Sequence, residues 1–240
     1  MIINADDFGK TREITDKILD CFDNGSLTHA SVIVNTDAFD YAIEEWKKRK
    51  GLGLTLHLNL TDGYPLTSCD MLIDDTGKFN QTFWSLVHSK DATMNEQVRK
   101  EITAQIEKLL PHVKDLRIDG HYYCHLVPFI FNIITELDYE ISYMRLVNEK
   151  FFLCLSKLNH LRRNFFAWRY LNSLYQKYKA TLSLLDISYP DYFIGLLYGG
   201  SMTEQVARKA LSIIPKGANV EILFHPRRDF EAGVIKRFFR

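Results

Sequence analysis

The chain is short of cysteine, and its N-terminus has none of the features of a secretion signal. Its four cysteines show no short paired spacing of the CxxC type, so we expect a reduced, cytoplasmic setting. The N-terminus lacks the basic stretch and the long apolar core of a signal peptide. No apolar run approaches the roughly 18–20 residues that a membrane-spanning helix needs, so we expect no membrane span.

The chain also lacks an excess of either charge. Lysine plus arginine and aspartate plus glutamate number 30 each, so net charge does not point to a nucleic acid, and no nucleic-acid partner is expected. Six prolines and twelve glycines do not indicate disorder. A hydrophobic content of 46% is ample for a core, and 240 residues suit one large α/β or barrel domain or two small ones. Because no stretch resembles a linker, we expect one domain over residues 1–240.

Strand and helix signals alternate along this domain. The expected strands lie at residues 2–3, 30–35, 53–60, 116–119, 141–146 and 221–224. The expected helices cover residues 14–22, 39–50, 94–109 and 128–137, and residues 64–80 are expected to form a long loop. This alternation predicts a mostly parallel sheet, either open or closed into a barrel.

Polar and charged side chains gather where the expected strands end. In parallel sheets of this class, reactive groups lie at the carboxyl ends of the strands. Scattered structural polar residues would rarely be distributed in this way. The residues at or near these ends are Asp6, Asp7, His57, Asp119, His121, Arg145 and His225.

The first of these ends carries two adjacent carboxylates, Asp6 and Asp7, after an apolar strand. Neighbouring side chains of a strand point to opposite faces, so both serve one site only if the chain bends, and Phe8-Gly9 is the expected bend. One carboxylate would then hold a metal while the other handles protons. The alternative is that the pair belongs to a helix N-cap ahead of Thr11.

Histidines at two further strand ends complete a candidate metal set. His57 lies in an apolar strand, where a lone histidine is more often a hydrogen-bonded core residue than a ligand. His121 and His125 have His-x-x-x-His spacing, but the segment reads as a loop, where this spacing says little. Together Asp7, His57 and His121 would make a two-histidine, one-carboxylate set, which suits Zn²⁺ or another divalent ion.

Five segments resemble, in the same order, motifs of the YdjC-like carbohydrate deacetylases of the chito-oligosaccharide deacetylase type. They are Asn4–Gly9, Gly25–Asn35, Gly53–Leu66, Ile118–His125 and the Glu-x-x-x-His-Pro segment Glu221–Pro226. Gly120 and Tyr123 depart from the usual Ser and His of the family, and Arg227-Arg228 replaces a small residue after the last motif. The resemblance covers most of residues 1–147 and then 191–228.

The resemblance implies the fold and the chemistry. It implies an α/β fold, an irregular seven-stranded TIM-like (β/α) barrel, and hydrolysis of an N-acetyl group from an amino sugar or short N-acetylglucosamine oligosaccharide. A divalent ion, Zn²⁺ or Mg²⁺, would activate water for this reaction. The implied metal ligands are Asp7, His57 and His121; Asp6 is the implied base, and His225 is the implied acid or holds the acetate-side oxygen.

Arg145 and His125 are the expected substrate-binding residues. Arg145 follows the strand after the His121 segment, and it would either fix the substrate or hold Asp6 ionised. An ion pair on the outer surface is the alternative for Arg145.

Residues 148–190 match no motif, and we expect them to form a basic, aromatic helical insertion. Between Lys150 and Leu185 the chain has seven Lys or Arg, eight aromatic residues and no Asp or Glu. One interpretation is a contact surface for an anionic glycan, a lipid head group or a nucleic acid. Another is a helical pair that covers the barrel, and a third is a homo-oligomer interface. Because this insertion follows a strand end, we expect it to border the mouth of the site.

Two other function classes are compatible with the same residues. One is a different metal-dependent hydrolase, acting on another amide or on a phosphate ester, since fold does not fix substrate. The other is a non-catalytic sugar-binding regulator. The presence of all five polar residues of the implied reaction centre argues against the regulator.

Overall fold

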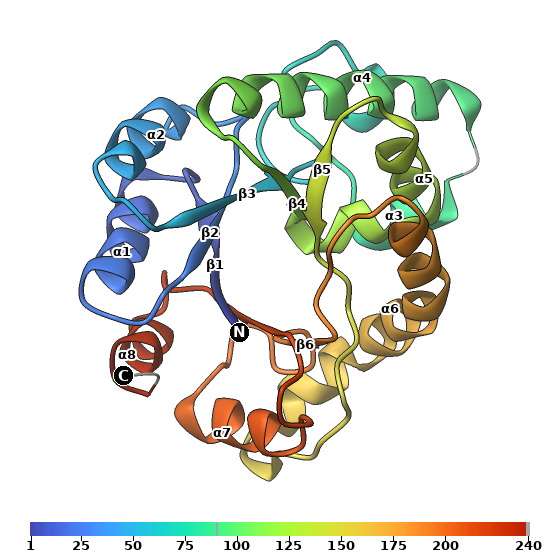
Figure 1. Cartoon of the computed structure of the whole chain (residues 1–240). Helices are drawn as coiled ribbons and strands as arrows, with labels where there is room; N and C mark the ends of the chain where they lie inside the picture. The colour runs from blue at the N-terminus through green and yellow to red at the C-terminus, as the bar shows by residue number, and fades with distance from the viewer. Residues whose placement is uncertain (90, 239–240) are drawn as a thin grey trace.

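Seven parallel strands form one curled sheet, surrounded by helices, in a computed structural model that describes residues 1–89 and 91–238 (Figure 1). The strands are β1 (Ile2–Phe8), β2 (His29–Val32), β3 (Gly53–Leu58), β4 (Leu116–Gly120), β5 (Ile141–Met144), β6 (Tyr192–Ile194) and β7 (Val220–Phe224). Their order in the sheet is β5-β4-β3-β2-β1-β7-β6, and every pair is parallel. The predicted seven-stranded (β/α) barrel is therefore confirmed.

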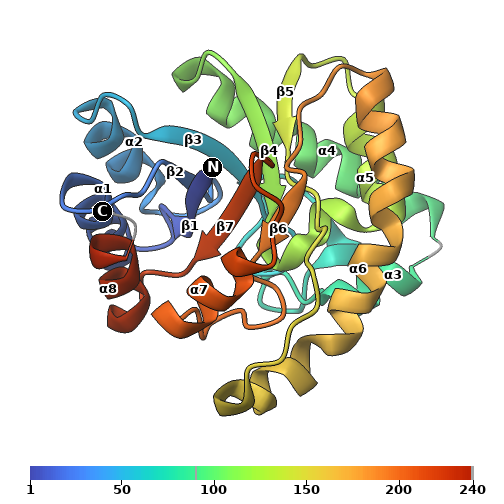
Figure 2. The same ribbon diagram turned by 60° about the horizontal axis from the view of Figure 1, so that its bottom comes forward.

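The helices follow the strands and cover the outside of the sheet (Figures 1 and 2). They are α1 (Arg12–Asp23), α2 (Phe39–Lys47), α3 (Phe83–His88), α4 (Ala92–Leu109), α5 (Pro128–Glu136), α6 (Leu158–Leu184), α7 (Glu204–Ser212) and α8 (Asp229–Arg237). Single 3₁₀ turns lie at Asp70–Leu72, Leu110–His112 and Leu155–Lys157, and a 3₁₀ segment at His121–Leu126 is kinked at Tyr122 and Tyr123, which both have positive φ. In the described part of the chain, no helix has both the length and the apolar character needed to cross a bilayer.

Strands β5 and β6 are the two edges of the sheet, and they do not pair with each other. We call the gap between them the seam, and the chain that connects the two strands forms backbone hydrogen bonds on both sides of it. The amide of Met144 donates to the carbonyl of Ser188, and the amide of Ser188 donates to Ser142, at 2.9 and 3.1 Å. On the other side, the amide of Phe193 in β6 donates to the carbonyl of Asn148 at 3.1 Å. The chain that joins β5 to β6 thus satisfies backbone groups that would otherwise lie on exposed sheet edges.

The strands consist mostly of consecutive apolar residues because both of their faces are buried, one against the helices and the other in the interior of the barrel. All five residues of β7 are buried, including the polar Glu221. At the start of α1, the side chain of Thr11 accepts a hydrogen bond from the amide of Ile14 and caps the helix. The alternative interpretation of Asp6 and Asp7 as part of an N-cap is therefore wrong, since both lie within β1.

Helix α6 occupies most of the basic, aromatic segment and is one long helix rather than a helical pair. Its buried side chains, Leu161, Leu171, Tyr175, Tyr178 and Leu182, pack on the barrel. The ring of Tyr178 stacks on that of Phe131 in α5, with centroids 3.8 Å apart and planes 8° apart. This packing fixes the helix against the side of the barrel where the ring is open (Figure 2).

Candidate active site

A cavity of about 690 Å³ opens at the carboxyl ends of the strands. Its floor includes five residues that the sequence singled out: Asp6, Asp7, His57, His121 and His225. Helix α6 contributes Arg163, Asn164, Ala167 and Leu171 to one wall, and Thr82, Phe83 and Trp84 belong to another. The segment predicted to border the mouth therefore does contribute to the cavity.

Both carboxylates of β1 reach this cavity because the strand is distorted at its end. The pairing of β1 with β2 shifts register between Ala5 and Phe8, and Asp7 has a left-handed backbone with φ of 74°. Aspartate is one of the few residues besides glycine that adopts this conformation at modest cost. The predicted bend therefore lies one residue earlier than expected, at Asp7, and Gly9 with φ of 78° continues the turn.

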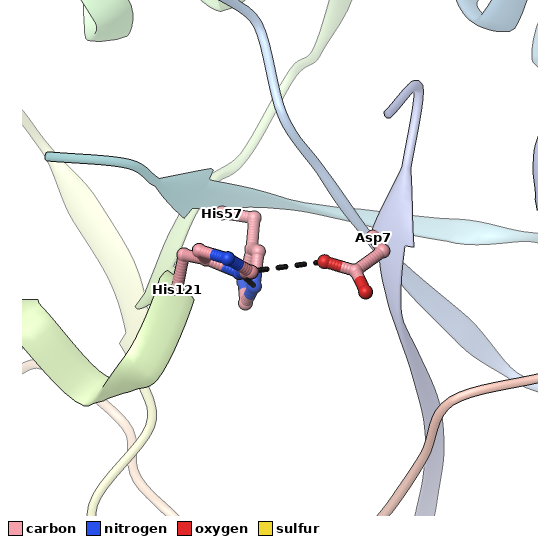
Figure 3. Close-up of side chains that lie close together, drawn as sticks. All are labelled: Asp7, His57 and His121. Atoms are coloured by element: carbon pink, nitrogen blue, oxygen red, sulfur yellow. Dashed lines mark hydrogen bonds and ion pairs between the residues drawn. The ribbon is translucent and has the colours of Figure 1, made fainter. Parts of the chain in front are cut away.

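Asp7, His57 and His121 converge at the floor of the cavity from three strand ends (Figure 3). The Nδ1 atom of His121 lies 3.3 Å from Oδ1 of Asp7 and 3.4 Å from Nε2 of His57. Two ligand atoms that each lie about 2.1 Å from a shared ion are separated by roughly 3.0 Å at a right angle and 3.4 Å at the tetrahedral angle. The spacing of these atoms therefore fits a common cation.

The carboxylate of Asp7 is buried, and among the described residues neither of its oxygens accepts a hydrogen bond of good geometry, although Nδ1 of His121 lies 3.3 Å from Oδ1. Buried polar atoms normally have a partner, so two such oxygens in one carboxylate indicate a missing ligand. The nearest cations are the Nη1 atom of Arg227, 3.4 Å from Oδ2, and Nζ of Lys10, 4.0 Å from Oδ1. An ion held by Asp7 and the two imidazoles would satisfy these oxygens.

Asp119 orients His57 for such a role. The Nδ1 atom of His57 lies 2.6 Å from Oδ1 of Asp119, so Nδ1 carries the proton and the lone pair of Nε2 faces the cavity. The other oxygen of Asp119 accepts a hydrogen bond from the hydroxyl of Ser31 at 2.6 Å. A carboxylate behind a metal-binding imidazole is a recurrent arrangement in metal sites, where it fixes the ring and makes it a better donor.

The buried charged groups of the site shift one another's pKa values. Burial alone would raise the pKa of Asp7, but His121, His225 and His57 outweigh it and hold that pKa well below its ordinary value. Burial lowers the pKa of His121, which favours the neutral ring that a metal requires. Burial also disfavours the charged form of His57, but Asp6 and Asp119 outweigh it and raise its pKa, so a cation competes with a proton for Nε2.

Arg145 lies beneath the floor of the cavity and contacts three carboxylates. Its side chain is fully buried, and its guanidinium lies 3.0 Å from Asp6, 2.6 Å from Asp119 and 2.7 Å from Glu221. Both terminal nitrogens reach Asp6, which also accepts a hydrogen bond from the side-chain amide of Asn4 at 2.9 Å. These contacts hold the carboxylate of Asp6 in place at the cavity, where it is one of the lining residues.

His225 follows β7 and lines the same cavity as the two imidazoles. Its backbone amide donates to Oε2 of Glu231, and its Nδ1 lies 4.0 Å from the same oxygen. Burial lowers the pKa of His225 below its ordinary value, while Asp6 and Glu231 act in the opposite direction. The ring therefore combines access to the cavity with a carboxylate behind it.

His125 and Arg145 do not line the cavity. The Nε2–H of His125 donates to the backbone carbonyl of Arg145 at 2.9 Å, and the ring is fully buried. It also packs against Gly120, where an added Cβ would lie 2.8 Å from Nδ1 of His125. The glycine that replaces the usual serine therefore makes room for this ring. Direct substrate contact by these two side chains stays a prediction, and the structure places both behind the cavity floor.

Several residues that hold the site gave a weak sequence signal. Ser31 and Asn4 are uncharged strand residues, and nothing distinguishes them from structural serines and asparagines. Tyr143 donates its hydroxyl to Glu221 at 2.6 Å and so fixes the carboxylate that fixes Arg145. Glu221 opens the Glu-x-x-x-His-Pro segment, so its position was recognisable although its role was not.

Glu149 fixes the backbone of a loop that lines the cavity. Its carboxylate accepts hydrogen bonds from the backbone amides of Gly195 and Leu197, at 2.8 and 2.7 Å, and is itself buried. Gly195 and Leu196 in the same loop line the cavity. Burial raises the pKa of Glu149 to about 7, although the amides that donate to it act in the opposite direction.

Comparison with known proteins supplies an independent line of evidence. The sequence model of the family described as YdjC-like protein matches residues 1–237. A carbohydrate deacetylase of Geobacillus stearothermophilus is 25% identical over 226 residues, which make up 94% of this chain and 78% of that protein. A carbohydrate deacetylase of Listeria monocytogenes is 31% identical over 203 residues, covering 81% of this chain and 82% of that protein.

One further relative and one solved structure extend the comparison. The chitooligosaccharide deacetylase of Yersinia enterocolitica is 28% identical over 144 residues, covering 59% of this chain and 56% of that protein. A crystal structure of an Enterococcus faecalis protein, provisionally described as a cellobiose-phosphate cleavage protein, superposes with a TM-score of 0.72 at 20% identity. The superposition covers 98% of this chain and 89% of that one, and it shows that the two share a fold.

Proposed function

Because the chain belongs to the YdjC-like family, we propose that it is a hydrolase that removes an N-acetyl group from an amino sugar or a short N-acetylglucosamine oligosaccharide. The observation that carries this proposal is the convergence of Asp7, His57 and His121 beside Asp6 at the floor of one cavity. The names of the relatives support a carbohydrate as substrate and deacetylation as the reaction.

Asp7, His57 and His121 would hold a divalent cation. When bound, the ion acts as a Lewis acid toward the amide carbonyl and makes water more acidic. Two imidazoles and one carboxylate suit Zn²⁺ better than Mg²⁺, which prefers oxygen ligands. The unpartnered oxygens of Asp7 and the outward-facing Nε2 of His57 support this assignment.

Asp6 is the proposed general base. It accepts a proton from the water that attacks the carbonyl carbon of the acetamido group. Hydrogen bonds from Arg145 and Asn4 hold its carboxylate in one orientation at the cavity, and a general base must be positioned in this way to reach the water. Oδ2 of Asp6 lies 3.7 Å from Nε2 of His57, so the base lies next to the proposed metal ligands.

His225 is the proposed general acid. It supplies a proton to the sugar nitrogen as the carbon–nitrogen bond breaks, so that acetate and the free amine leave as products. Burial lowers the pKa of His225, and Asp6 and Glu231 act against burial by favouring the charged form that an acid needs before this step. The cavity wall adds exposed rings of Trp84 and Tyr122, whose apolar faces suit the C–H faces of a sugar.

The decisive experiment combines metal analysis of the purified protein with an acetate-release assay on N,N′-diacetylchitobiose. Asp6→Asn is expected to keep the metal and to lose about 10²–10⁴-fold in turnover. Asp7→Asn is expected to lose the metal. Asp70→Asn, an exposed aspartate away from the cavity, is the matched control and should behave like the wild type.

The opposite result for the two carboxylates would reverse their roles. A metal-loaded protein that releases no acetate but cleaves another amide or a phosphate ester would identify a different hydrolase on the same scaffold. Sugar binding without turnover by the metal-loaded protein would identify a regulator.

A further inference from the structure

The segment that leads into α6 exposes apolar side chains in a fixed pattern. Residues 151–154 belong to no helix or strand, and exposed and buried positions alternate from residue 151 to residue 155. The outward side chains are Phe151, Leu153 and Leu155, which are 49%, 43% and 73% exposed. The hydroxyl of Tyr198 fixes the segment, because it accepts from the amide of Cys154 at 2.8 Å and donates to the carbonyl of Phe152 at 2.9 Å. These exposed apolar groups are therefore held in place by the fold.

The first turns of α6 continue this surface. Leu158, Arg162 and Phe166 follow one another at four-residue spacing, which puts them in one row along the helix, and Arg169 continues the row one turn later. Leu158 is 42% exposed and Phe166 is 72% exposed. We call the outward side chains of the two elements the apolar–basic surface: Phe151, Leu153, Leu155, Leu158, Arg162, Phe166 and Arg169.

Ring contacts join the two elements into one surface. The ring of Phe151 lies 5.5 Å from that of Trp168 and 6.4 Å from that of Phe165, which in turn lies 6.0 Å from Phe166. Figure 2 shows this end of α6 and the segment before it projecting beyond the barrel. The surface is therefore contiguous and accessible to a large, flat partner.

The charged side chains within residues 150–185 all have one sign. Residues 150–185 contain seven Lys or Arg and no Asp or Glu. Within residues 1–89 and 91–238, none of the seven forms an ion pair with a carboxylate, whereas Lys48, Arg49 and Arg99 elsewhere on the surface do. A surface of unpaired cations with exposed Phe and Leu is the composition of helices that lie on anionic bilayers.

We propose that the apolar–basic surface docks the protein on an anionic lipid bilayer. Phenylalanine and leucine side chains offer no hydrogen bonds to a glycan, whereas they gain free energy when they enter the region between head groups and acyl chains. A second copy related by a two-fold axis would bring Arg162 and Arg169 against the same cations of the partner. Anionic head groups match both the charge and the apolar character of the surface.

Docking would place the cavity beside the bilayer. Arg163, Asn164 and Ala167 line the cavity, and they alternate along α6 with the outward residues Arg162 and Phe166. The wall of the cavity and the membrane contact are thus two faces of one helix. This docking goes beyond the proposed deacetylation and does not depend on it.

Co-sedimentation of the full chain with vesicles tests the proposal. Binding is expected with phosphatidylcholine vesicles that contain phosphatidylglycerol, not with phosphatidylcholine alone, and it should weaken as salt is added. Removing one basic side chain from such a contact weakens binding about fivefold, so the Arg162→Gln, Arg169→Gln double variant should lose about 25-fold. The Leu155→Ser, Phe166→Ser double variant should also weaken binding.

Lys50→Gln and Phe230→Ser are the matched controls, because both residues are exposed and lie outside residues 150–185. Both should bind vesicles like the wild type. Equal binding to neutral vesicles, no binding at all, or equal losses in the controls would overturn the proposal. A dimer in light scattering that dissociates on Phe166→Ser, or preferential retention of single-stranded RNA, would overturn it as well.

Acetate release from soluble chitobiose, measured on the same variants, keeps the two proposals apart. Arg162 and Arg169 do not line the cavity, so their replacement should leave this activity unchanged. Loss of vesicle binding with intact acetate release would support the docking surface. Vesicle binding without any acetate release would support docking and count against deacetylation.

Discussion

Replacing Arg145 with methionine should destabilise the protein more than any surface charge substitution. The guanidinium contacts Asp6, Asp119 and Glu221 in a site that excludes water. Removing one partner of a buried ion pair costs about 3–5 kcal/mol, because the remaining charge is left uncompensated. Here three carboxylates lose one shared cation, so we expect a loss near the upper end, against a total stability of about 5–15 kcal/mol.

Urea unfolding followed by circular dichroism measures this loss, and a double-mutant cycle with Glu221→Gln identifies its cause. Among residues 1–89 and 91–238, the carboxylate of Glu221 accepts hydrogen bonds from Arg145 and from the hydroxyl of Tyr143, so neutralising it removes one of the uncompensated charges. The double variant should therefore lose less than the sum of the single variants, by about 0.5–3 kcal/mol.

The control for this cycle is Arg99→Met, which breaks an exposed pair with Glu136 and should cost less than about 1 kcal/mol. If Arg145→Met does not accumulate as folded protein, Arg145→Lys, which keeps the charge but not the planar fork, allows the same measurement with a smaller loss. A stability of Arg145→Met within about 1 kcal/mol of the wild type, or strict additivity with Glu221→Gln, would refute the reasoning.

Three further outcomes are expected. Asp119→Asn should weaken Zn²⁺ binding in a calorimetric titration by about 10–100-fold, because the imidazole of β3 loses its orienting carboxylate; unchanged affinity would show that this carboxylate does not tune the site. Burial raises the pKa of Glu149 to about 7, above its unfolded value of 4.5, so its contribution to stability is complete below pH 4.5 and falls by up to about 3 kcal/mol as the pH rises to 7. Glu149→Gln should lack this decline in urea unfolding at pH 5 and pH 8, and an identical pH slope in both proteins would contradict it. Gly195→Ala should destabilise the protein by at least about 1–3 kcal/mol, because φ is 146° and the new Cβ would lie 2.6 Å from Leu223. Gly51→Ala, with φ of 98° and open space, controls for the backbone term, and an equal loss in both would rule out the steric cause.

The sequence was informative about the fold wherever an element was long enough to show its period. The alternation of apolar runs with amphipathic stretches predicted a mostly parallel sheet, and it placed α4 and α5 to within a few residues. The closure of this sheet into a barrel was implied by the family resemblance. Strand β6 has three residues, Tyr192–Ile194, which are too few to show alternation. Helices α3 and α7 were not predicted, although Thr82 and Thr203 cap them with side-chain hydrogen bonds. Each of these helices has a capping threonine, but α3 with six residues and α7 with nine are too short to show a clear helical period.

The candidate site was predictable to the extent that strand ends determine it. The carboxyl ends of β1, β3 and β4 must meet at one end of the barrel, which brings Asp7, His57 and His121 together whatever the details. The left-handed backbone of Asp7 was not predictable, because it arises from a register shift between β1 and β2. The inward direction of Arg145 depends on the parity of the residues after β5, and one residue of slip would turn it outward.

Because the ring of strands is open between β5 and β6, the wall of the cavity that α6 forms can change while the strands that carry the candidate site keep their positions. The chain leaves the ring after β5 and re-enters it at β6, so lengthening or replacing α6 changes one wall of the cavity without moving the register of any strand. Asp7 and His57 lie on β1 and β3, and His121 directly follows β4, so all three are insulated from such changes. The same candidate site could therefore accept ligands of different size, or act at a different place in the cell, through substitutions confined to the segment between β5 and β6.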